Sequence, residues 1–106
     1  MQNQAQKLEA TCSLYNRAET LISGPHSAFV TLWLADGPLN TYWYGVAEIA
    51  ASDQELHEWV FGDDQQNTYI DIQFDDGNGG LAKQIVCKRV ADIFHVSFFG
   101  QSAWGN

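Results

Sequence analysis

The residues that most resemble a ligand-binding loop lie at positions 75–80, with the sequence Asp-Asp-Gly-Asn-Gly-Gly. A phosphate-binding loop needs a following helix and a P-loop lysine or serine, whereas a strand pattern follows here. A calcium loop of the EF-hand type, counted from Asp71, requires a glycine at its sixth position and a glutamate at its twelfth, where this chain has Asp76 and Ala82. The composition therefore predicts an acidic turn, with weak cation binding by its aspartates as the alternative.

The histidines and cysteines do not form a recognisable metal or redox motif. His26, His57 and His95 lie in three different predicted elements, and none has the spacing of a zinc motif. We interpret His95 as a partly buried, hydrogen-bonded histidine, with a general base as the alternative. Cys12 and Cys87 are interpreted as small core residues. No metal and no cofactor is expected.

Aromatic side chains are densest at Tyr42-Trp43-Tyr44, which a hairpin would bring close to Trp33. Aromatic residues are common in protein cores, at protein interfaces and in ligand pockets. A domain of this size needs large side chains in its centre, so core packing is one interpretation. The others are an oligomer interface and a small-molecule pocket, and Phe99 is a further candidate for either.

The charge is strongly asymmetric: 13 Asp and Glu stand against 5 Lys and Arg, giving a net charge of −8. Residues 18–82 contain no Lys or Arg but eleven acidic residues. Such a segment creates a negative field that repels phosphate backbones, so direct nucleic-acid binding is disfavoured. One interpretation is that the charge only keeps a small aromatic-rich domain in solution. The other is an acidic face for a basic partner, whose candidate residues are Asp63, Asp64, Asp75 and Asp76.

Two helices are predicted to position these residues. Apolar residues recur at steps of three and four across residues 3–23, the period of one helix face. They are Ala5, Leu8, Cys12, Tyr15, Ala18 and Ile22. Gly24-Pro25 is a strong end signal, because glycine accepts the left-handed conformation and proline cannot continue the helix. A short second helix is predicted between a capping box that starts at Ser52 and a stop at Gly62.

Five further segments have the residue types and alternation of β-strands. They cover residues 28–34, 39–49, 70–74, 83–90 and 93–99. A turn at residues 36–38 joins the first two strands into a hairpin, in which Tyr42 and Tyr44 share one face and Trp43 points to the other. The tight connection at residues 91–92 joins the last two strands. Strands 28–34 and 93–99 lack polar alternation, so both of their faces are expected to be covered.

This order predicts a single α+β domain over residues 1–106. Its N-terminal amphipathic helix precedes a curved, mostly antiparallel five-stranded sheet, with the short helix between the second and third strands. The sheet is either a small closed barrel or open, with the first helix across its concave face. Residues 1–6 resemble neither a secretory signal nor a transit peptide, and no apolar run approaches the length of a membrane span. The expected compartment is the cytoplasm, with no membrane partner.

These features predict a non-enzymatic interaction module that presents an acidic and aromatic surface to a protein with a basic face. The alternative is a small-molecule-binding protein or small enzyme, with an aromatic-lined pocket between the sheet and the first helix. Two helices cannot cover both faces of several apolar strands, so either the sheet curls upon itself or a second chain supplies the cover, and we expect the second chain. We therefore predict a homo-oligomer, a dimer, anchored by Trp33, Trp43 and Phe99.

Overall fold

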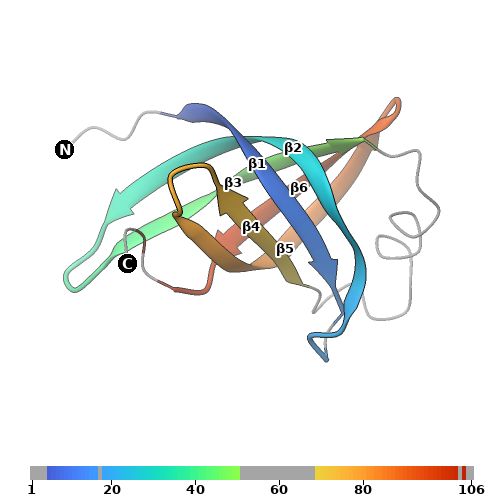
Figure 1. Cartoon of the computed structure of the whole chain (residues 1–106). Coiled ribbons are helices and arrows are strands. Elements are labelled where there is room, and N and C mark those ends of the chain that lie inside the picture. Colours follow the sequence, from blue (N-terminus) through green and yellow to red (C-terminus); the bar gives the residue numbers. More distant parts are fainter. Residues whose placement is uncertain (1–4, 17, 51–68, 103, 105–106) are drawn as a thin grey trace.

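A computed structural model describes residues 5–16, 18–50, 69–102 and 104, and in it six antiparallel strands close into a barrel (Figure 1). The strands are β1 (Gln6–Tyr15), β2 (Leu21–Asp36), β3 (Thr41–Ala50), β4 (Tyr69–Phe74), β5 (Gly79–Val90) and β6 (Ile93–Gly100). Their order around the barrel is β1-β2-β3-β6-β5-β4. The first three and the last three strands each form a meander, and the two meanders meet where β3 pairs with β6 and where β1 pairs with β4.

The predicted N-terminal helix is wrong, because its residues form β1 and the start of β2. Every second side chain of β1 faces the barrel interior, and the buried ones are Ala10, Cys12 and Leu14. Ala10 and Leu14 are not part of the helical spacing, but together with Cys12 they form the alternation of a strand, with every second residue apolar. The intervening threonine and serine face outward, and such residues form helices less readily than alanine or leucine. Pairing of β1 with β2 and β4 therefore decides the conformation of a segment whose own pattern fits both periods.

Gly24-Pro25, predicted to end a helix, lies instead within β2 at an irregularity of the β1–β2 ladder. Cys12 is in register with His26 and Leu14 with Ser23, so Ser13 faces two residues of β2. Gly24 has φ +129°, and a Cβ on it would lie 2.8 Å from the Cα of Ser13. Glycine can adopt a positive φ, which is why it is common at helix ends. In β2 the same property permits a bulge and a close approach of two strands.

The predicted hairpins are confirmed. β2 pairs with β3 from Ala28–Ile49 to Asp36–Thr41, and β5 pairs with β6 across the turn at residues 91–92. In Figure 1 these two hairpins extend toward opposite sides of the molecule. The strand predicted at residues 70–74 is also present, as β4.

Large apolar side chains fill the barrel. Fully buried are Trp43, Phe94, Phe98, Leu14, Leu32, Ile49, Ile70, Ile72, Val30 and Val96. This closure corrects the α+β fold class: within the described ranges all elements are strands, six of them rather than five, and the sheet covers its own inner face. The short helix predicted at residues 52–62 lies outside the described residues. Among the residues that the structure describes, no helix has the length and apolar character needed to cross a lipid bilayer.

The C-terminal segment closes one end of the barrel over Trp43. The Trp43 Nε1 donates a hydrogen bond of 2.7 Å to the carbonyl oxygen of Ser102. The Trp43 ring centroid lies 5.7 Å from that of Phe98 and 5.7 Å from that of Trp104. The amide of Trp104 donates to the carbonyl of Thr41 at 2.9 Å, so the chain after β6 is tied to the start of β3. A buried indole thus has both aromatic neighbours and a partner for its polar atom.

Candidate functional site

Strand alternation divides the aromatic run of β3 between the inside and the outside of the barrel. Trp43 is fully buried, whereas Tyr42 is exposed and Tyr44 half-buried on the outer wall. The predicted division of these three side chains between two faces is therefore confirmed. Trp43 cannot serve as a surface anchor, and its assignment to an interface or pocket is corrected to the core of the single chain.

Four outward-facing aromatic residues form a continuous surface across three strands. We call it the aromatic strip, and it consists of Trp33 of β2, Tyr42 and Tyr44 of β3 and Phe99 of β6. Tyr44 is in register with Trp33 on one side and with Phe99 on the other. Its ring stacks on both, at centroid distances of 6.1 Å and 6.0 Å with interplanar angles of 10° and 8°. Tyr42 approaches Phe99 diagonally, at 6.2 Å. Cross-strand stacking of this kind fixes the rings against the sheet.

A groove of about 290 Å³ lies along the aromatic strip. Its lining residues are Trp33, Tyr44, Gly45, Val46, Ile85, Ser97, Phe98 and Phe99. Ile85 is 61% exposed because the ladder of β5 with β6 shifts register between Gln84 and Val86, which turns an additional apolar side chain outward. None of the lining residues is acidic or basic, although the chain as a whole is strongly acidic.

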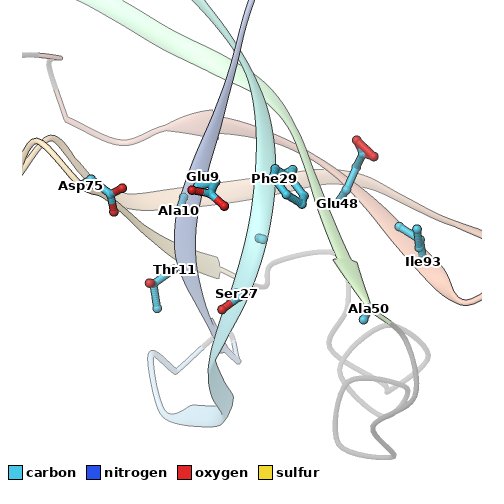
Figure 2. Close-up of a pocket in the computed structure, with 10 residues that line it drawn as sticks. Glu9, Ala10, Thr11, Ser27, Phe29, Glu48, Ala50, Asp75 and Ile93 are labelled. Atoms are coloured by element: carbon cyan, nitrogen blue, oxygen red, sulfur yellow. The ribbon is translucent and has the colours of Figure 1, made fainter.

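A second groove, of about 440 Å³, lies elsewhere on the outer wall (Figure 2). Its lining residues are Glu9, Ala10, Thr11, Ser27, Ala28, Phe29, Glu48, Ala50, Asp75 and Ile93. We call it the acidic groove. Phe29 is in register with Glu9 on one side and with Glu48 on the other. Figure 2 shows Asp75, from the turn after β4, beyond Glu9, so that Asp75, Glu9, Phe29 and Glu48 form a row across the barrel wall. Thr11 and Ser27, two exposed residues that line the groove near Phe29, have small side chains.

Lys7 reaches into this row from β1. Its Nζ lies 3.4 Å from the Oε2 of Glu48 and 5.8 Å from the ring centroid of Phe29. The ammonium group therefore contacts both a carboxylate and an aromatic face, the two kinds of group that attract a cation.

The structure separates the acidic residues that the sequence grouped together. Asp75 lines the acidic groove, whereas the neighbouring Asp76 is exposed outside it. The backbone N–H and then the side-chain amide of Asn78 donate to the Asp76 carboxylate, both at 2.9 Å, and they lower the pKa of that carboxyl. These bonds give Asp76 a role within its turn. Asp63 and Asp64 lie outside the described residues.

The pocket predicted between the sheet and an N-terminal helix is wrong, because that segment is part of the barrel wall. Asp71 and Gln73 lie on the outside of β4, where the Nε2 of Gln73 donates to the Oδ1 of Asp71 at 2.8 Å. His95 is half-buried, also on the outer wall, in register with Glu48. Among the described residues, no three His, Cys, Asp or Glu side chains form a group able to hold a metal ion.

Both cysteines are free thiols that belong to the core or pack against it, as predicted. Burial raises the pKa of the Cys12 thiol to about 12, with a smaller contribution from the charge of Asp71. Burial alone raises the pKa of Cys87 to about 11. Thiols with such pKa values are protonated at neutral pH, which makes them poor nucleophiles.

Sequence reasoning did not find Lys7, Glu9, Phe29 and Glu48 as members of one site. The first two were assigned to a helix, and the others were treated as ordinary strand positions. The alternation of β1 was the available signal, since it places Lys7 and Glu9 on the outer face together.

Comparisons with protein-family models, with curated proteins and with solved structures find no match for this chain. The two surfaces of the barrel wall are therefore the observations from which a function is inferred.

Proposed function

We propose that this chain is a non-enzymatic protein-interaction domain whose aromatic strip binds a protein partner, and that in the purified protein the partner is a second copy of the chain. The observation that carries this proposal is the stack of Trp33, Tyr44 and Phe99 on the outer wall of the barrel. Phe99 remains 41% exposed even within the stack. Large, rigid aromatic side chains held at a surface are the residues that most often dominate binding energy at protein interfaces.

The chemical character of the strip supports binding rather than catalysis. Its groove is lined by aromatic and aliphatic groups, with hydroxyl groups only from Tyr44 and Ser97. Stacking already fixes the rings, so little side-chain entropy remains to be lost when a partner covers them. An apolar groove of this kind gains free energy by excluding water.

The charge distribution supports a second copy as the partner. Two chains that each carry a net charge of −8 repel one another over most of their surface. The groove along the strip is lined by uncharged side chains, so two copies can approach there with the least repulsion. The same charge makes nucleic acid an unfavourable partner. We place the domain in the cytoplasm as part of this proposal, which the two free thiols support.

Light scattering at increasing protein concentration tests the proposal. We expect the mass of two chains at tens of micromolar, and the mass of one chain for Phe99→Ser at the same concentrations. The matched control is Leu21→Ser, which removes a side chain that is 52% exposed on β2, outside the strip. Its mass should equal that of the wild type.

Salt distinguishes this mode of association from attraction between charges. Adding salt screens the repulsion between two acidic chains, so the dimer should become stronger or stay unchanged. A single-chain mass for the wild type at every concentration, or equal masses for Phe99→Ser and the wild type, would refute the proposal.

A further inference from the structure

We propose that the acidic groove binds an arginine side chain from a basic segment of a partner protein, and that Lys7 competes for the same site. This surface differs from the aromatic strip, and the proposal does not depend on self-association. The segment we infer carries an arginine beside an apolar residue.

The first argument is that a cation of this chain already contacts two residues that line the groove, Glu48 and Phe29. The Nζ of Lys7 lies 3.4 Å from the Glu48 carboxylate and 5.8 Å from the centroid of the Phe29 ring. The lysine side chain itself is largely exposed, so solvent competes for its ammonium group. Its position shows that Glu48 and Phe29 accommodate a positively charged side chain, and its exposure leaves the ammonium group accessible to solvent.

The second argument is that one lysine does not neutralise the groove. Three carboxylates line it, from Glu9, Glu48 and Asp75, and Lys7 pairs with Glu48. In the described part of the chain, no Lys, Arg or His forms an ion pair with Glu9 or Asp75. Two negative charges therefore remain at one end of the row, beside a half-exposed aromatic ring. A cationic partner is complementary to this arrangement.

The third argument concerns the shape of the cation. Phe29 is 51% exposed and offers a flat face between carboxylates on the neighbouring strands, which lie about 4.8 Å away on either side. A guanidinium group can stack on the ring and donate sideways to a carboxylate, whereas an ammonium group is a compact, strongly hydrated point charge. Ile93 and Ala50 at the other end of the groove provide an apolar contact for the residue next to the arginine.

The probe is a fluorescein-labelled peptide of sequence Leu-Arg-Leu-Arg-Leu, whose binding is followed by fluorescence anisotropy at low and at physiological salt. The double variant Glu9→Gln/Asp75→Asn should weaken binding about fivefold, since each exposed ion pair contributes modestly. The matched control Glu19→Gln/Asp92→Asn removes the same charge from exposed positions outside the groove and should change the affinity less than about twofold. Phe29→Leu retains charge and apolarity and should weaken binding about threefold.

Competition by Lys7 gives a separate test. Lys7→Met should strengthen peptide binding about threefold, because it removes the internal occupant. Lys83→Met removes the same charge from β5, outside the groove, and should leave the affinity nearly unchanged. Equal gains from the two variants would show that only the overall field attracts the peptide, which would overturn the proposal.

Two further results would also overturn it. One is the absence of binding at millimolar peptide, and the other is equal or tighter binding of Leu-Lys-Leu-Lys-Leu. All titrations are repeated in the Phe99→Ser background, where binding should persist. If self-association is lost while peptide binding persists, the two surfaces act independently. If peptide binding is lost while self-association persists, the acidic groove proposal fails and the aromatic strip proposal stands. Unfolding curves of each variant confirm that the barrel remains folded.

Discussion

Gly100 lies so close to the indole of Trp43 that a Cβ on this glycine would be 2.0 Å from Cε2 and 2.1 Å from Nε1. The indole cannot move away easily, because it packs against Phe98 and Trp104 and donates a hydrogen bond to a backbone carbonyl. Glycine at the end of β6 therefore makes room for the largest side chain of the core.

Gly100→Ala should lower the free energy of unfolding by about 3 kcal/mol, because overpacking a close-packed core costs this much when neighbours cannot adjust. Urea unfolding followed by circular dichroism measures the change. Gly77→Ala is the comparison: a Cβ there meets nothing within 4 Å, and only the φ of +87° opposes it. This variant should lose about 1 kcal/mol. Equal losses would contradict the packing argument.

Trp43→Ala should destabilise the barrel by about 4 kcal/mol, since it leaves a large cavity and an unpaired carbonyl at Ser102. Urea unfolding again provides the measurement. Wherever the variant is folded, its mass in light scattering should equal that of the wild type, because Trp43 is fully buried within one chain. A change of mass in the folded variant would place Trp43 at the interface after all.

The raised thiol pKa values predict a loss of stability at alkaline pH. Above pH 9 the unfolded chain releases thiol protons, whereas Cys12, with a pKa of about 12, and Cys87, with a pKa of about 11, retain them in the folded state. The native state then binds more protons, so the free energy of unfolding falls as the pH rises, by up to about 1.4 kcal/mol per pH unit and thiol. Well below pH 9 the thiols of both states are protonated and contribute no slope.

Urea unfolding at pH 8 to 11 checks this window. Cys12→Ala should reduce the fall of the unfolding free energy with pH by the contribution of one thiol. Cys87→Ala should have a similar effect up to pH 11. Tyrosine and lysine titrate in the same range, so the difference from the wild type is the quantity to compare. An unchanged slope in Cys12→Ala would mean that this thiol ionises as readily in the folded barrel as in the unfolded chain.

Local patterns were sufficient where one period fits a segment. In β3 the inward position of Trp43 and the outward positions of Tyr42 and Tyr44 follow from alternation alone, and two of the strip's stacked residues come from adjacent strands of one predicted hairpin. In β1 the small apolar residues fit a helix and a strand equally well. Its pairing with β4, whose sequence lies far along the chain, determined the outcome.

The acidic groove could not be predicted for a related reason. Glu9, Phe29 and Glu48 belong to three different strands. The register between strands cannot be predicted from the sequence of any single strand. The sequence pattern predicts that the adjacent Asp75 and Asp76 act on one surface, whereas Asp75 lines the groove and Asp76 accepts hydrogen bonds within its own turn. Neighbours across strands, rather than neighbours along the chain, make up this surface.

Each of the six described strands has a hydrogen-bonded neighbour on both sides. The pairing is incomplete at some strand ends: among the described strands, β2 pairs with β3 only from Ala28 onward, and β5 pairs with β4 only up to Lys83. Within the described barrel, backbone edges on which another chain could extend the sheet are therefore limited to such overhangs. Growth of cross-β aggregates needs such an edge. Separation of β1 from β4 would expose two longer edges at once, on which the backbone of another chain could pair.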